Sequence, residues 1–225
     1  MLPQPLSDLW NAYLETENLR LRSERNIALD RFLDSFATLP LATQRKWAIQ
    51  FVTAPDFEAL TIRMPLFRRV LLPLVRTAVD DRVPRCAHWL SKHAHLIYKC
   101  RDTISDLPDT YTEHGLLLTA LDHDETDDNS RRRLVELMAN QMEYTLHELP
   151  SGVLYGHDGA TVSECREMLA ELDDFVVHAT RLGVTDTYAD LISDCRFHYT
   201  QYAKYLADRR GVTSYADYLS RLSDA

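Results

Sequence analysis

The chain has 225 residues, of which 45% are hydrophobic and 26% charged, the composition of a globular protein with a substantial core. Its formal net charge of −9 argues against a surface that binds duplex nucleic acid, because such surfaces need clustered cations. Crossing a bilayer as a helix takes about 20 consecutive apolar residues, and no such run occurs, so we predict no membrane span.

Short helices are predicted in the N-terminal part of the chain. Ser7 can cap the first helix, and a highly charged stretch over residues 15–26 separates its apolar stripe from that of the second. The second helix stops before Pro40, because the residue preceding a proline disfavours helical backbone. Thr43 opens a third helix, which ends at Pro55.

The most strongly patterned stretch is residues 66–100, which we predict to form two helices folded back on each other at residues 80–81. Apolar side chains recur at helical spacing in both halves. Pro84 falls in the first turn of the second helix, where proline is tolerated. We expect residues 86–100 to form one continuous helix and Trp89 to be buried between the two helices.

This stretch resembles a HEAT-type helical repeat. Such repeats place Leu-Pro in an apolar helix, Asp in the turn, and Val with a small residue pair at the start of the next helix. The matching residues here are Leu72-Pro73-Leu74, Asp80-Asp81, Val83, Cys86-Ala87 and Leu90. The resemblance implies a scaffold of stacked antiparallel helix pairs and does not imply an activity.

Further helices are predicted after a loop at Pro108. One spans residues 111–121 behind a capping box, and a charged turn over residues 122–133 separates it from a helix that stops at Pro150. A second capping box at Thr161 opens another long helix. We therefore predict one all-α domain over the whole chain, HEAT-like or an irregular helical bundle, with at most a weak division near residues 104–110.

An internal repeat marks the C-terminal part. The segment that follows Gly183, Val-Thr-Asp-Thr-Tyr-Ala-Asp, recurs after Gly211 as Val-Thr-Ser-Tyr-Ala-Asp, one residue shorter. Glycine that ends one helix and Thr or Ser that caps the next explain much of this pattern. Between the two copies, three tyrosines crowd one helix, and we expect them to pack at the edge of the core. They are Tyr199, Tyr202 and Tyr205.

Metal and redox chemistry have little support in the sequence. No cysteine spacing suits zinc, and the acidic run after Asp122 lacks the glycine and the final glutamate of an EF-hand loop. We expect reduced, buried thiols in a cytoplasmic protein and no cofactor. The thiols are Cys86, Cys100, Cys165 and Cys195.

Acid–histidine pairs nevertheless recur four residues apart on three predicted helices. If they converged, they could hold a metal ion and make the chain a metal-dependent enzyme. The same spacing is also an ordinary helix-stabilising arrangement. The pairs are Glu143 with His147, Asp174 with His178, and Asp194 with His198.

The loop over residues 150–160 is the preferred candidate for recognition, because it holds apolar side chains between prolines and glycines, where solvent is expected. The alternative is that these side chains plug the core. The candidate binding residues are Val153, Leu154, Tyr155, His157 and Asp158. Together with the negative charge, this loop favours a non-enzymatic protein-interaction module that neutralises or scaffolds a basic partner protein.

Overall fold

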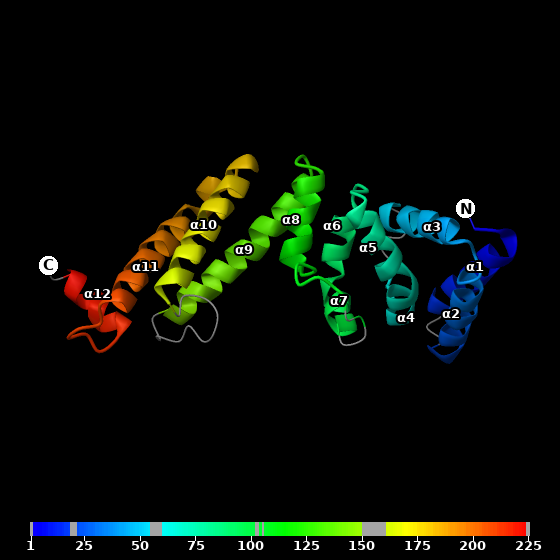
Figure 1. Ribbon diagram of the computed structural model, residues 1–225, viewed down its shortest axis with the longest axis horizontal. Helices are drawn as coiled ribbons and strands as arrows, with labels where there is room; N and C mark the ends of the chain where they lie inside the picture. The colour runs from blue at the N-terminus through cyan, green and yellow to red at the C-terminus, as the bar shows by residue number, and fades with distance from the viewer. Residues whose placement is uncertain are drawn as a thin grey trace. The chain divides into compact units, whose positions relative to one another are not determined.

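The computed structural model describes residues 2–18, 22–54, 60–101, 104, 106–149 and 161–223. Within these residues the chain is helical and contains no β-strand, which confirms the predicted all-α class (Figure 1). The chain divides into two compact units, Met1–Ser130 and Arg131–Ala225. The sequence predicts one domain with at most a weak division near residues 104–110. The division falls later, in the first turn of helix α9 (Asp128–Glu148).

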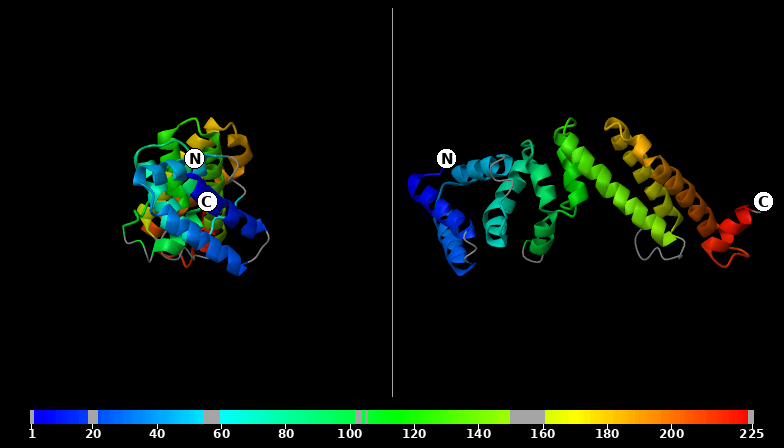
Figure 2. Two further views of the ribbon diagram at one scale, coloured as in Figure 1. Left: turned by 90° about the vertical axis from the view of Figure 1, so that its right-hand side faces the viewer. Right: turned by 180° about the vertical axis from the view of Figure 1, so that it is seen from behind.

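The first unit is built of helices that pack on their neighbours in sequence. Helices α1 and α2 lie side by side in Figures 1 and 2, and α3 packs on α5 and α6. Helix α6 also packs on α8. The bounds are α1 (Gln4–Asn18), α2 (Arg22–Phe36), α3 (Leu41–Thr53), α5 (Leu72–Asp80), α6 (Cys86–Lys92) and α8 (Glu113–His123).

A cluster of aromatic rings joins α1, α2 and α3. The ring of Trp47 has its centroid 4.9 Å from that of Phe36, 5.1 Å from that of Phe51 and 5.5 Å from that of Trp10. Trp10 in turn lies 4.9 Å from Phe32. All five side chains are buried, so the apolar stripes of the predicted N-terminal helices do form a core.

The central stretch enters α5 through an irregular helix. It runs from α4 (Met64–Leu66) through a π-helical turn, η2 (Phe67–Leu71), in which the N–H of Leu72 donates to the carbonyl of Phe67 five residues earlier. Pro73 supplies a physical reason: it has no N–H, and in a regular α-helix its ring would collide with the carbonyl of the residue four places before it. The wider π turn accommodates the proline.

The turn between α5 and α6 confirms the predicted fold-back and is strained. Arg82 and Arg85 have positive φ angles of 57° and 68°, which non-glycine residues rarely adopt. Their side chains are anchored outside the turn. Arg82 donates to the Asp122 carboxylate at 2.8 Å, and Arg85 donates to the Thr53 carbonyl at 3.2 Å.

The prediction of one continuous helix over residues 86–100 is wrong, because α6 ends and α7 (Ala94–Cys100) begins at His93. The N–H of His93 donates to the Leu90 carbonyl, so the carbonyl of Trp89 loses its regular helical donor. The Nδ1–H of His93 takes that place at 2.9 Å. Trp89 is only partly buried, and its ring stacks on that of His93 at 4.2 Å.

Ion pairs tie this central stretch to the segments around it. Within residues 60–101 the only carboxylates are Asp80 and Asp81, whereas arginine and lysine recur throughout. Exposed pairs are worth about 0–1 kcal/mol each, so they align the segments more than they stabilise them. The exposed pairs are Arg69 with Asp34, Arg76 with Asp106, Arg82 with Asp122, and Arg101 with Asp109. A partly buried pair joins Arg63 to Glu17.

The second unit contains most of α9 together with α10 (Val162–Arg181), the 3-10 turn η5 (Thr185–Tyr188), α11 (Ala189–Ala207) and α12 (Tyr215–Ser223). Helices α10 and α11 pack along each other. The predicted capping box at the start of α10 is confirmed. The N–H of Thr161 donates to the Glu164 carboxylate at 2.7 Å, and the N–H of Glu164 donates to the Thr161 hydroxyl at 3.2 Å.

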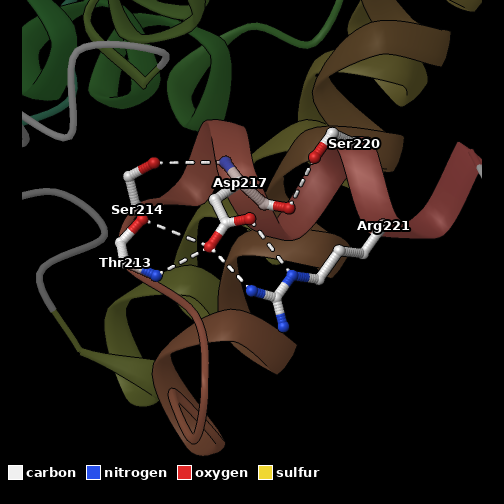
Figure 3. Close-up of polar contacts among 5 residues, drawn as sticks. All are labelled: Thr213, Ser214, Asp217, Ser220 and Arg221. Atoms are coloured by element: carbon white, nitrogen blue, oxygen red, sulfur yellow. Dashed lines mark hydrogen bonds and ion pairs between the residues drawn. The ribbon is translucent and has the colours of Figure 1, made fainter.

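In both copies of the internal repeat, one helix ends and the next helix begins shortly after it. Gly183 and Gly211 adopt left-handed φ angles of 68° and 71°. In the second copy Ser214 accepts the N–H of Asp217, and the Asp217 carboxylate accepts the N–H of Thr213 and bonds from Arg221 (Figure 3). The first copy is one residue longer; its residues Thr185–Tyr188 form η5, and α11 starts without a side-chain cap.

Tyrosines fix α12 to α11, as expected for packing at the edge of the core. The buried ring of Tyr215 lies 4.9 Å from Tyr202 and 5.7 Å from Tyr205. Tyr218 lies 5.9 Å from Tyr205. The close spacing of tyrosines on α11 therefore serves the docking of the C-terminal helix.

Candidate functional site

The predicted recognition loop lies outside the described residues. Its role as a recognition site or as a core plug therefore stays a prediction. The residues concerned are Val153, Leu154, Tyr155, His157 and Asp158.

The acid–histidine pairs do not form a metal centre. Among the described residues, no group of three or more His, Cys, Asp or Glu side chains is placed to hold a metal ion. His178 Nδ1 instead lies 3.0 Å from a guanidinium nitrogen of Arg131, and His198 Nδ1 lies 3.0 Å from the Tyr215 hydroxyl. The convergence considered for Glu143, His147, Asp174, His178, Asp194 and His198 is thus not found, because the histidines of α10 and α11 contact other side chains.

A Ser–His–Asp cluster, not foreseen from the sequence, lies in the first unit. Ser130 Oγ donates to the Asp127 carboxylate at 2.6 Å and lies 2.7 Å from His88 Nδ1. The Asp127 carboxylate also accepts the N–H of Ser130 at 3.1 Å, which caps α9. Ser130 is fully buried, so its hydroxyl cannot reach a substrate, and we interpret the cluster as a structural cap.

The four cysteines are buried thiols, none of which forms a disulfide, as expected. Burial raises the pKa of Cys86 and of Cys165 to about 11. Burial also raises the pKa of Cys100 and Cys195. Nucleophilic chemistry needs the thiolate, so these positions do not form a reactive site.

The described part of the second unit contains a narrow pocket between α9, α10 and α11. Its free volume is about 20 Å³, which holds one water-sized group. Small-molecule sites are usually clefts of about 300–1,000 Å³, so this pocket is too small for a metabolite. It is lined by Gln141, Met142, Thr145, Met168, Glu171 and Tyr199.

The pocket has an exposed rim and a buried floor. Gln141 and Glu171 are exposed, whereas Met142, Thr145, Met168 and Tyr199 are at most 7% exposed. Thr145 Oγ1 donates its hydrogen to the carbonyl of Gln141 at 2.9 Å, and the Thr145 side chain is also hydrogen-bonded to the Tyr199 hydroxyl. Burial raises the pKa of Tyr199 above its ordinary value of 10.

Carboxylates run along α10 beside the pocket. Glu167, Glu171 and Asp174 are spaced four and three residues apart, which places them on one side of the helix. All three are exposed, as is Glu143 on α9. Glu143, Glu167 and Asp174 make no ion pair with any residue that the structure describes. We call Glu167, Glu171 and Asp174 the acidic stripe; its spacing is visible in the sequence, but the pocket beside it is not.

Large exposed apolar side chains do not gather on any described helix. Each of them lies on a different helix, so none of these helices presents an apolar stripe to solvent. They are Ile27, Leu41, Tyr98, Leu118, Tyr144, Val177, Phe197 and Leu222.

Comparisons with protein-family models, curated proteins and solved structures find no match to this chain. None of the helices in the described ranges has the length and apolar character needed to cross a membrane. The case for a function therefore depends on the chain's own residues.

Proposed function

We propose that this chain is a non-enzymatic protein-interaction module whose partner is a basic protein. The observation that carries the proposal is the acidic stripe on α10 next to the pocket between α9, α10 and α11. Glu167 and Asp174, the two carboxylates of the stripe that make no ion pair with any residue the structure describes, remain available to cations of a partner. A basic protein supplies lysine and arginine at high density.

The net charge of −9 supports the same partner class. Long-range attraction between opposite charges raises the rate of association, and close contacts then set the rate of dissociation. Because exposed charges are screened beyond about 8 Å at physiological ionic strength, added salt should slow association more than it speeds dissociation.

The test compares two variants that lose the same charge. The first variant, E143Q/E167Q/D174N, neutralises Glu143 on α9 and two carboxylates of the acidic stripe. The control neutralises exposed carboxylates elsewhere in the second unit, D186N/D190N/D194N. Each variant and the unmodified chain are immobilised and incubated with an extract of the cells that make the protein, and bound proteins are identified by mass spectrometry.

We expect the unmodified chain and the control to retain the same basic proteins, and the stripe variant to lose them. Association rates measured with a purified captured protein should fall as salt rises. Capture of mainly acidic proteins, or equal loss in both variants, would contradict the proposal.

A further inference from the structure

We infer that His178 regulates the acidic stripe: on protonation it releases Arg131 and offsets the charge of Asp174, which weakens the binding of a basic partner at acidic pH. This inference rests on the proposed function and adds a regulation to it. It follows from the hydrogen bond between His178 and Arg131, from the burial of Arg131 and from the spacing of His178 and Asp174 on α10.

The contact with Arg131 fixes the protonation state of His178. A guanidinium carries only N–H donors, and a nitrogen of the Arg131 guanidinium lies 3.0 Å from His178 Nδ1. His178 Nδ1 must therefore accept the hydrogen bond, which requires a neutral imidazole with its hydrogen on Nε2. Arg131 is 2% exposed, so water screens its charge from the ring only weakly. An imidazolium in the same position would present an N–H to the guanidinium and lose the bond.

The position of His178 on α10 gives the protonated ring another partner. Asp174 lies four residues before it, and an acid four residues N-terminal to a cation is the favourable order for an ion pair on a helix. His178 also lies in the last turn of α10, where the helix dipole stabilises a positive charge. The His178 side chain is only partly buried, whereas Asp174 is exposed, so the two can meet at the surface.

Other charged groups lie on the helices that pack around His178, and they set the pH at which it changes state. Arg181, three residues later on α10, opposes protonation. On α9, Arg131 opposes it as well, and the residues one turn after Arg131 are buried and apolar. The segments that follow α10 and pack on it contribute exposed carboxylates, which favour protonation. These are Asp186 in η5 and Asp190 and Asp194 at the start of α11.

The pH range of the effect distinguishes histidine from the groups that bind the partner. Histidine is the side chain that ordinarily changes charge between about pH 5 and 8. Carboxyl groups ordinarily titrate near pH 4 and lysine near pH 10. A basic partner and the carboxylates of the stripe thus keep their charges between pH 7.5 and 5.5, while an imidazolium at position 178 would offset one charge of the stripe.

The experiment titrates octalysine into the purified chain by isothermal titration calorimetry at low salt, at pH 7.5 and at pH 5.5. The variant H178Q keeps an oxygen that can accept from Arg131 but cannot take up a proton. The matched control H147Q removes His147, which belongs to an exposed acid–histidine pair of the same spacing on α9.

We expect the unmodified chain and H147Q to lose about threefold more affinity than H178Q between pH 7.5 and 5.5, the size of one exposed charge pair. D174N should bind more weakly at pH 7.5 and show the same small pH dependence as H178Q. Circular dichroism melts at both pH values report whether each variant is folded, and D174N provides the comparison if H178Q is not.

Nitrogen-15 NMR of the histidine rings tests the chemistry without a ligand. The His178 signals, assigned by their absence in H178Q, should show an unprotonated Nδ1 and a protonated Nε2 at pH 7.5. Both nitrogens should be protonated at pH 5.5. A protonated Nδ1 at pH 7.5, or an unchanged ring at pH 5.5, would overturn the inference.

The binding outcomes keep the two proposals apart. If octalysine binds at pH 7.5 but H178Q loses as much affinity at pH 5.5 as the unmodified chain, His178 does not regulate the stripe, although the basic partner stands. If octalysine does not bind at low salt at either pH, both proposals fail.

Discussion

Trp47 and Trp89, two of the three tryptophans of the first unit, differ in burial, and their replacement by alanine should differ in cost. Trp47 is 8% exposed and touches four aromatic rings, the centroids lying 4.9–5.7 Å away. Removing a buried tryptophan costs about 3–5 kcal/mol, and we expect Trp47→Ala to fall in this range. Trp89 is only partly buried and stacks mainly on His93. We therefore expect Trp89→Ala to cost about 1–3 kcal/mol, since burial supplies roughly 25 cal/mol per Å² and less area is lost.

The measurement is urea denaturation followed by far-UV circular dichroism, which does not depend on the removed fluorophore. The slope of the transition should stay the same in both variants, so that midpoints report stability directly. A double replacement of Trp89 and His93 should show a coupling of about 0.5–1.5 kcal/mol from their stacked rings. If Trp89→Ala destabilises as much as Trp47→Ala, the assignment of Trp89 to the edge of the core is wrong.

Three further outcomes follow from burial and hydrogen bonding. A thiol-reactive dye should modify the native protein slowly at pH 8, because burial raises the pKa of each thiol, that of Cys86 to about 11. After the protein is unfolded, the dye should modify all four cysteines. Rapid labelling of the native protein would contradict this prediction. Burial lowers the pKa of His93 below its ordinary value of 6.5. The contribution of His93 to stability should therefore be complete above pH 6.5 and decrease as the pH falls below 6.5. The variant H93Q, measured by urea denaturation at pH 7.5 and 5.5, should lack this part of the pH dependence. Ser130→Ala should cost about 1–2 kcal/mol in thermal unfolding, because it removes the hydroxyl between His88 and the Asp127 cap; an unchanged melting temperature would show that the cluster does not matter for stability.

Helical periodicity was sufficient to predict the fold class and most of the buried faces, although Trp89 is only partly buried. It failed at His93, where nothing in the spacing of apolar residues signals that a side chain replaces a backbone donor. It also could not foresee the π turn before Pro73, because proline in a helix can kink it, end it or widen it. The HEAT-type resemblance of this stretch stays a prediction.

The candidate site was harder to predict from the sequence than the fold. The pocket joins residues of three helices that are distant in sequence, and no local pattern shows that Thr145, Glu171 and Tyr199 meet. The acid–histidine pairs illustrate the opposite error. Their regular spacing suggested convergence, but spacing along one helix does not determine which face of that helix meets its neighbours.

Under the proposed function, the distribution of charge favours the acidic stripe as the contact with a basic partner. In the first unit, carboxylates such as Asp34, Asp106 and Asp122 pair with arginines of the basic central stretch, so part of the negative charge is used to align segments. The central stretch itself contributes Asp80 and Asp81 as its only carboxylates. On α10, by contrast, Glu167 and Asp174 find no cation among the described residues. Because a carboxylate already held by an internal arginine has less to gain from an external one, attraction for a basic protein should depend on the acidic stripe more than on the total charge.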